Sequence, residues 1–187
     1  PRPSLKDVVL FYPKDYHSYH RPTIALFRML AHVNINQRIK RYRQLIGVRG
    51  DVLDVGCGDG EIMAALRAVG PYTCSGIEIK QEVAEIARAK NFTVYDGVLE
   101  TIQSLPEKKF DLVIMNHVIE HLIDPQTAVA KVARLVKEGG WVCGETPSTD
   151  SFERLMFCDK WAGLHAPRHL QVFSPNAIRM LFLQSGF

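Results

Sequence analysis

The chain has 187 residues, a formal net charge of +3, 47% hydrophobic residues and 23% charged residues. This balance is that of an ordinary globular protein and excludes a disordered chain, while the apolar runs are far too short to span a bilayer. The length suits a single domain over residues 1–187, and the mild charge gives no reason to expect nucleic acid as a partner.

The first element expected is a helical arm within residues 1–47. Apolar residues recur at helical spacing over residues 23–46, and Gly47 follows as a plausible stop. The basic run "RIKRYR" at residues 38–43 is interpreted as a solvated helix face. The first twenty residues lack the arrangement of a secretory signal, and the four cysteines form no CxxC pair, so we expect reduced thiols and a cytoplasmic protein.

From residue 51 the sequence alternates between two kinds of segment. Short apolar or β-branched runs predict five strands: "DVLDVG", "YTCSGIEI", "FTVYD", "FDLVIMN" and "GGWVCGET". Between them, "GEIMAALRAVG", "QEVAEIARAKN" and "PQTAVAKVARLVKEGG" each place apolar residues on one stripe and predict helices. The alternation predicts an α/β fold with a parallel sheet covered by helices on both faces.

A glycine loop follows the first expected strand. In "VLDVGCGDGEI", Gly56, Gly58 and Gly60 lie between the strand and a helix. Glycine lets the backbone turn tightly and approach a ligand closely, and the helix presents free N–H groups. Such a loop alone is weak evidence, because tight strand-to-helix turns use glycine in any case. It points to a nucleotide-like ligand.

Two carboxylates near the loop narrow the kind of ligand. Glu78 ends the second strand about 20 residues further on, where doubly wound folds bind ribose hydroxyls. A NAD site would require glycine or alanine at position 61, and this chain has Glu61, so a dinucleotide is disfavoured. Asp54, just before the loop, would repel a pyrophosphate but suits a sulfonium or an amino group.

These motifs, taken in order, resemble those of class I S-adenosylmethionine-dependent methyltransferases. The resemblance covers about residues 45–187 and rests on "VLDVGCGDG", "GIEI", "VYDG", "FDLVIMNHVIEHLIDP" and "GGWVCGETP". It implies a Rossmann-like, doubly wound, mostly parallel sheet with strand order 3-2-1-4-5. "FYPKDYHSY" and "APRHLQVFSPNAIRMLFLQSGF" are similar to the ubiquinone-biosynthesis-like subgroup of small-molecule methyltransferases.

The resemblance also implies the cofactor site. The implied contacts are Asp54, Gly56, Cys57 and Gly58 near the methionine part, Glu78 on the ribose, Ile79 against adenine, Asp96 and Gly97 near the adenine amino group, and Asn116 beside the sulfonium. For Asp96, an ordinary turn aspartate is an equal alternative. The family normally adds two strands after the last helix. Because this sequence ends at "QSGF", we expect it to lack them or to be a fragment, with an exposed edge at the fifth strand and a possible homodimer.

The segment "HVIEH", residues 117–121, follows the fourth strand and is therefore expected at the reaction centre. A helical turn there would put His117, Glu120 and His121 on one face. The pattern resembles the inverted zinc-protease motif, but that motif needs a long helix, so we reject a protease. Some methyltransferases that act on the terminal ribose of small RNAs or on ubiquinone precursors carry ExxEH here and a later histidine, which corresponds to His169.

That second resemblance implies a divalent metal held by His117, Glu120, His121 and His169. Three imidazoles and one carboxylate favour zinc, iron, cobalt or manganese over magnesium. The metal would lower the pKa of an acceptor hydroxyl. In the alternative, these residues only pack and hydrogen-bond, and His117 or His169 acts as a general base.

The expected function is methyl transfer from S-adenosylmethionine to a small-molecule acceptor, at oxygen. Residues 48–187 would form the cofactor-binding core, and an insert near residues 151–170 would cover the acceptor pocket. The alternative is a non-catalytic S-adenosylmethionine-binding regulatory or partner subunit.

Overall fold

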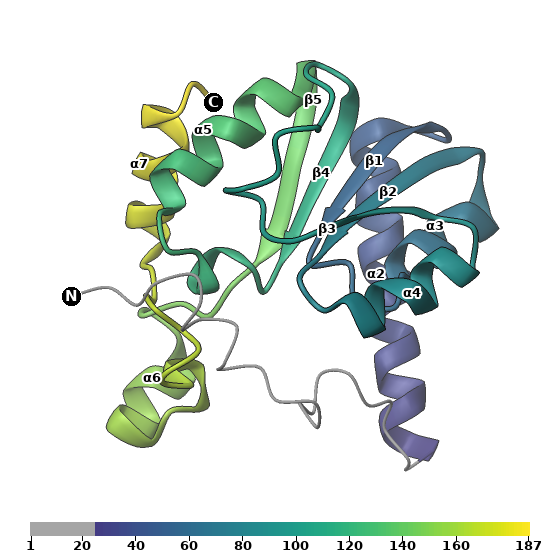
Figure 1. The fold of residues 1–187 in the computed structure, drawn as a ribbon. Helices are drawn as coiled ribbons and strands as arrows, with labels where there is room; N and C mark the ends of the chain where they lie inside the picture. The colour runs from purple at the N-terminus through teal and green to yellow at the C-terminus, as the bar shows by residue number, and fades with distance from the viewer. Residues whose placement is uncertain (1–24) are drawn as a thin grey trace.

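A five-stranded sheet forms the centre of the computed structural model, which describes residues 25–187 (Figure 1). The strand order is β3-β2-β1-β4-β5 and every neighbouring pair is parallel, which confirms the predicted fold class and order. The strands are β1 (Gly50–Val55), β2 (Tyr72–Glu78), β3 (Thr93–Asp96), β4 (Phe110–Asn116) and β5 (Val136–Glu145). The "FYPKDYHSY" segment lies outside the described residues.

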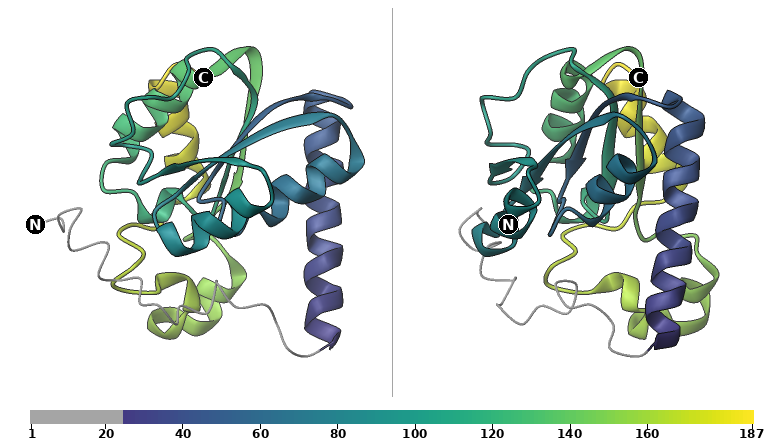
Figure 2. Two further views of the ribbon diagram at one scale, coloured as in Figure 1. Left: turned by 45° about the vertical axis from the view of Figure 1, so that its right-hand side comes forward. Right: turned by 90° about the vertical axis from the view of Figure 1, so that its right-hand side faces the viewer.

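Helices cover both faces of this sheet (Figures 1 and 2). One face packs against α2 (Ala25–Ile46), α3 (Glu61–Val69) and α4 (Gln81–Ala89), and the other against α5 (Pro125–Leu135) and α7 (Pro175–Gln184). Each face has its own apolar cluster, because side chains alternate along the strands: Leu112 and Ile114 enter one cluster, and Val113 and Met115 enter the other.

The boundary between α5 and β5 corrects one prediction. The helix was expected to include "VKEGG", but it ends at Leu135 and the strand begins at the next residue, Val136. The backbone N–H groups of Lys108 and Lys109 donate to the carbonyls of Arg134 and Leu135, so the loop before β4 caps the helix early. A register shift then accommodates the two glycines that the sequence pattern had assigned to the helix end.

The arm helix α2 packs against the sheet through a narrow stripe. Ile39 and Tyr42 are buried, at 5% and 1% exposure, within the cluster that α3 and α4 share. The interpretation of "RIKRYR" as a solvated face is therefore wrong at these two positions. It holds for Lys40, Arg41 and Arg43, which are exposed.

All five strands point their carboxyl ends toward one edge of the sheet. Beyond that edge lie η2 (Ile119–His121), α6 (Phe152–Phe157), η3 (Cys158–Lys160) and η4 (Ala162–Leu164), and one end of α2 projects in the same direction (Figures 1 and 2). The predicted site residues follow the strands at this edge, where open α/β sheets bind ligands. Within residues 25–187, no helix combines the length and the apolar character that a membrane crossing requires.

Candidate functional site

The glycine loop is bonded closely to the end of β2. The N–H groups of Gly56 and Cys57 both donate to the carbonyl of Ile77, at 2.8 and 3.0 Å. Gly58 has a φ of +54°, and a Cβ placed on it would meet nothing within 4 Å, so this part of the loop faces open space. We call Asp54, Gly56–Gly58 and Gly76–Glu78 the β1–β2 corner.

Gly76 allows this close approach. A Cβ at Gly76 would lie 2.3 Å from Cys57 Sγ and 2.8 Å from Cys57 Cβ. Because Cys57 is itself buried, its side chain has little room to move. The sequence analysis identified the loop glycines but missed this glycine, which has no turn signal and lies in the middle of a strand.

The carboxylate of Glu78 is 4% exposed and holds the loop in place. Its Oε2 accepts from Gly58 N at 3.0 Å and its Oε1 from Lys80 N at 2.9 Å. Burial raises the pKa of Glu78, and these backbone N–H groups oppose the rise. An ionised carboxylate has about four acceptor positions, so two hydroxyls could still bond to Glu78.

Asp54, at the end of β1, is a second buried carboxyl group, at 4% exposure. Burial raises the pKa of Asp54 to about 7, the nearby Glu78 adds to the rise, and Arg38 opposes it. Two carboxyl groups in a poorly solvated corner favour a ligand that carries positive charge.

The remaining predicted cofactor residues surround this corner. Asn116 Nδ2 donates to the hydroxyl of Tyr42 at 3.0 Å, while its Oδ1 is buried and has no hydrogen-bond partner among the described residues. Gly97 N donates to the carbonyl of Glu78, and Ile79 is half-buried. Asp96 is exposed and pairs with Arg88 at 2.8 Å, as a surface turn aspartate would.

His117 begins the second group of polar residues, at the end of β4. It adopts a φ of +52°, and the helical turn starts only at Ile119, so His117 is not part of that turn. Its Nδ1 lies 3.4 Å from Glu120 Oε1, and its side chain is 57% exposed. The Glu120 carboxylate raises the pKa of His117.

Glu120 is fully buried, which is costly for a carboxylate unless partners compensate. Its Oε2 accepts from Thr146 Oγ1 at 2.9 Å. Oε1 has no aligned hydrogen bond, so the 3.4 Å contact with His117 is an ion-pair contact. Burial alone would raise the pKa of Glu120, but His117, Thr146 and nearby backbone lower it below its usual value.

The structure brings three of the four predicted metal ligands together. Ligand atoms of Glu120, His121 and His169 all lie within 4.8 Å of one another. The Nδ1 atoms of His121 and His169 lie 3.0 and 2.7 Å from the carbonyls of Arg168 and Gly163. A carbonyl can only accept, so these Nδ1 atoms carry the protons, and the lone pair of each neutral ring is on Nε2.

The fourth predicted ligand, His117, contacts Glu120 but does not belong to this group. The ring of His165, which the sequence analysis did not assign to the site, lies 5.1 Å from that of His169. We call His117, Glu120, His121, Thr146 and the segment 165–169 the β4–β5 corner.

Two further residues were missed because they come from the arm. Tyr42 contacts Asn116, and Arg38 Nη2 donates to Glu145 Oε2 at 2.5 Å. The burial stripe of α2 could have identified Tyr42, since Ile39 and Ile46 lie at helical spacing from it. No sequence signal distinguishes Arg38 from its basic neighbours.

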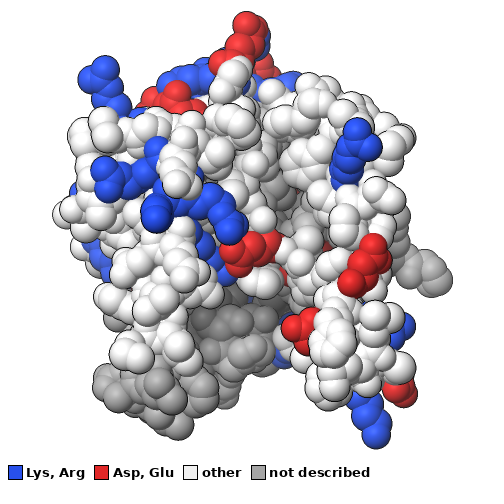
Figure 3. Space-filling model, turned by 180° about the vertical axis from the view of Figure 1, so that it is seen from behind, with Lys and Arg blue, Asp and Glu red and all other residues white. Residues whose placement is uncertain are grey.

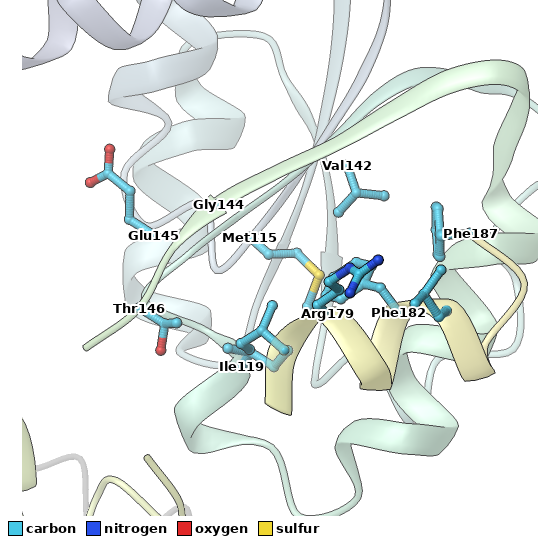
Figure 4. A pocket seen from close by; sticks show the side chains of 11 residues that line it. Met115, Ile119, Val142, Gly144, Glu145, Thr146, Arg179, Phe182 and Phe187 are labelled. Carbon is cyan, nitrogen blue, oxygen red and sulfur yellow. The ribbon is translucent and has the colours of Figure 1, made fainter. Parts of the chain in front are cut away.

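A cavity of about 400 Å³ lies between β5 and α7, and Thr146 of the β4–β5 corner is part of its lining. Its lining is mostly apolar and includes Met115, Ile119, Val142 and Phe182. Figure 4 shows Met115 pointing toward α7, whereas the Glu145 carboxylate turns away from the other labelled side chains. The cavity contains none of the predicted cofactor residues, so we do not assign it to the cofactor.

Comparisons with known proteins agree with this geometry. Residues 27–187 match a family model described as a methyltransferase domain. A ubiquinone biosynthesis O-methyltransferase of Thiobacillus denitrificans is 38% identical over 97 residues, which cover 49% of this chain and 41% of the relative. The one of Vibrio atlanticus is 33% identical over 125 residues, 62% of this chain and 52% of the relative.

Among solved structures, an S-adenosylmethionine-dependent methyltransferase from Archaeoglobus fulgidus is similar. Its TM-score is 0.67 at 26% identity, over 83% of this chain and 68% of that one. The chain spans about half the length of the curated relatives it matches.

Proposed function

The chain belongs to the class I S-adenosylmethionine-dependent methyltransferases, and on this premise we propose that it transfers a methyl group from S-adenosylmethionine to a hydroxyl of a small molecule. The choice of oxygen follows the relatives, which are named O-methyltransferases. The observation that carries the proposal is Glu78: a buried carboxylate, fixed against Gly58, with acceptor positions to spare beside a loop that faces open space.

The β1–β2 corner fits the cofactor in its charges and its acceptors. Glu78 would accept the ribose hydroxyls, with Ile79 against the adenine and Asp96 and Gly97 near its amino group. Asp54, Cys57 and the loop glycines would face the methionine part, and Asn116 the sulfonium. S-adenosylmethionine, when bound, supplies an electrophilic methyl group on sulfur. The protein then has to hold an acceptor hydroxyl in line with it and take up the hydroxyl proton.

The β4–β5 corner supplies groups for that proton. His117 contacts the Glu120 carboxylate through Nδ1, and its side chain is 57% exposed, so we propose His117 as the general base. His169 is the second candidate base. The insert 151–170 lies beyond the same edge, and we propose that it covers the acceptor (Figure 1).

A divalent cation is a second way to activate the hydroxyl. The donor set fits one, because ligand atoms of Glu120, His121 and His169 converge within 4.8 Å of one another and combine a carboxylate with two imidazoles. These residues, with His117 as a possible fourth, would hold the ion. Its chemistry would be to lower the pKa of a bound hydroxyl. Elemental analysis of wild-type protein and of His121→Ala tests this: equal, negligible metal content in both would contradict it.

Calorimetric titration with S-adenosylhomocysteine, the reaction's second product, tests the cofactor site. Glu78→Gln should weaken binding at least ~10-fold, since the amide removes acceptors and turns donors toward Gly58 and Lys80. Glu107→Gln, an exposed carboxylate outside the site, is the matched control and should bind like wild type. If wild type does not bind S-adenosylhomocysteine, the proposed function is wrong.

The alternative, a non-catalytic partner subunit, is favoured by one observation. β5 is an edge strand in the described part of the chain, and its Trp141 is 48% exposed. Such an edge can pair with another chain, including a second copy of this one. An enzyme should release S-adenosylhomocysteine when given S-adenosylmethionine and a set of small phenols and alcohols. Binding without release across that set, together with concentration-dependent self-association, would favour the subunit.

A further inference from the structure

Trp161 anchors the insert 151–170 to the rest of the molecule. Within this stretch, all of which the structure describes, Trp161 is the one buried residue, at 8% exposure. The large apolar side chains of α6 are exposed, with Phe152 at 70% and Leu155 at 73%. In Figure 3 this part of the chain, at the lower right, is a lobe of mostly uncharged surface. Because so little of the insert is buried, the contacts of Trp161 have a large share in fixing its position.

Gly163 packs directly on the ring of Trp161. Trp161 precedes the turn η4, and the N–H of Leu164 donates to the Trp161 carbonyl at 3.0 Å, which folds the chain back over the indole. A Cβ on Gly163 would lie no more than 2.5 Å from three atoms of that ring, Cζ2, Cε2 and Cη2. Gly163 does not have a left-handed backbone, so glycine is needed there for space. Because a buried indole has little room to move aside, a larger residue would displace the Gly163 peptide.

The carbonyl of Gly163 is bonded to the ring of His169. The distance from Gly163 O to His169 Nδ1 is 2.7 Å. Because a carbonyl only accepts, Nδ1 carries the proton and the lone pair of the neutral ring is on Nε2. The hydrogen bond of one ring nitrogen decides which tautomer a histidine adopts and so what the other nitrogen can do. The place of the Gly163 carbonyl therefore sets the tautomer of His169.

Backbone bonds place the His169 side chain but do not orient it. The N–H of Leu170, the next residue, donates to the Glu120 carbonyl at 2.9 Å, so His169 begins beside η2. A ligand atom of His169 lies within 4.8 Å of one on Glu120. The ring could still turn about its side-chain torsions. The bond to Gly163 stops this rotation, because it holds Nδ1 on one side and keeps Nε2 turned away from the Gly163 carbonyl.

We propose that Trp161 and Gly163 are positioning residues that fix the tautomer and the orientation of His169. Packing of Gly163 on the indole presents its carbonyl to Nδ1, and Nε2 is then the nitrogen with which His169 can take up a proton or bind a cation. The inference rests on the proposed function, which gives His169 that role, and it adds two residues that act through His169. A misplacement of about 1 Å can slow a reaction roughly 100-fold, so this support has a functional consequence.

Nitrogen NMR of isotope-labelled histidine rings tests the proposal without an acceptor, because protonated and unprotonated ring nitrogens resonate apart. His169→Gln identifies the signals of this ring. Wild type should carry the His169 proton on Nδ1. Gly163→Ala should shift the ratio of the two tautomers at least ~10-fold toward the one protonated on Nε2, since the displaced carbonyl no longer accepts from Nδ1. Ala162→Ser, which enlarges the exposed neighbouring residue, is the matched control and should leave the ratio unchanged.

Two further measurements separate positioning from a structural role. In calorimetric titration, Gly163→Ala should bind S-adenosylhomocysteine within ~3-fold of wild type, since Trp161 and Gly163 lie outside the β1–β2 corner. With an acceptor from the set of phenols and alcohols, the same variant should release S-adenosylhomocysteine at least ~10-fold more slowly than wild type. An unchanged rate in a variant whose tautomer ratio has changed would contradict a role for these residues in the reaction.

The tautomer results decide the remaining outcomes. A His169 proton on Nε2 in wild type would contradict the proposal. So would a Gly163→Ala variant that is less stable in urea but keeps the wild-type ratio, because the contact would then be structural only, and so would a changed ratio in Ala162→Ser. If Gly163→Ala does not fold, Trp161→Leu removes the ring instead and should give the same shift. Failure of wild type to bind S-adenosylhomocysteine would contradict the proposed function and leave the tautomer result standing.

Discussion

At the β1–β2 corner the residues with left-handed backbone are Gly56 and Gly58, whereas at the β4–β5 corner they are His117 and His165. Glycine adopts this conformation freely, so the first corner is formed with little strain. A histidine does so at a cost of roughly 1–2 kcal/mol. The comparison teaches that the backbone turn of the proposed cofactor corner is set by its own glycines, while that of the β4–β5 corner must be held by contacts from elsewhere in the chain.

The largest effect should come from the close packing of the β1–β2 corner. Gly76→Ala should reduce the free energy of unfolding by about 3 kcal/mol, because its Cβ would lie 2.3 Å from Cys57 Sγ. Urea unfolding measures this loss. Adding Cys57→Ala should restore part of the stability but not all, since Cys57 Cβ remains within 2.8 Å. An unchanged stability in Gly76→Ala would show that Gly76 and Cys57 are not closely packed in the β1–β2 corner.

The next effect concerns the buried charge of the same corner. In the folded protein the pKa of Asp54 is about 7, above its usual 3.8. Between these two values the folded carboxyl keeps its proton while the unfolded one loses it, so stability falls as pH rises. Asp54→Asn should therefore be more stable than wild type by about 2 kcal/mol at pH 8 and by little at pH 4.

Asp111 provides a control for the Asp54→Asn experiment, because the pKa of Asp111 is shifted in the opposite direction. Burial would raise the pKa of Asp111, but hydrogen bonds from Lys137 and from backbone N–H groups, together with the charge of Lys137, outweigh burial and lower it. Its contribution is present above the unfolded pKa and is lost as pH falls through the folded one. Asp111→Asn should thus cost stability at pH 8 and little at low pH, in thermal unfolding. If both variants showed the same pH trend, the opposite pKa shifts of Asp54 and Asp111 would be contradicted.

The next largest effect on stability should come from the hydrogen bond that Thr146 donates to the buried carboxylate of Glu120. Thr146→Val removes the hydroxyl that bonds Glu120 Oε2 and should cost about 1.5 kcal/mol of stability, because Glu120 has no exposure to water. Thr146→Ser keeps the hydroxyl and is the control. Equal stability of the Val and Ser variants in urea unfolding would mean that Glu120 does not depend on this bond.

The smallest effect isolates the backbone strain at His117. His117→Gly and His117→Ala both remove the imidazole, so their difference reports only the φ of +52°. The Gly variant should be more stable than the Ala variant by about 1 kcal/mol in thermal unfolding. A more stable Ala variant would show that the backbone at His117 is not strained, and the two corners would then not differ in backbone strain at this residue.

Much of the fold was predictable because its signals are local. The strand runs, the helix stripes and Gly56–Gly58 predicted a parallel sheet and the glycine loop, while the strand order came from the family resemblance. Strand direction placed Glu78 and His117 at one edge. The end of α5 was not predictable, because the helix is capped by Lys108 and Lys109 across the chain. Gly76 was missed for a similar reason, since its importance lies in a contact with Cys57.

The sequence by itself determined the elements, their order and the edge at which polar side chains gather, because periodicity and turn chemistry act between near neighbours. Only the tertiary structure decided that Arg38 and Tyr42 of α2 join that edge, that His117 stands apart from the Glu120, His121 and His169 group, and that Thr146 donates to Glu120. These contacts join residues far apart in the chain, and their distances and burial are fixed by how the helices pack on the sheet.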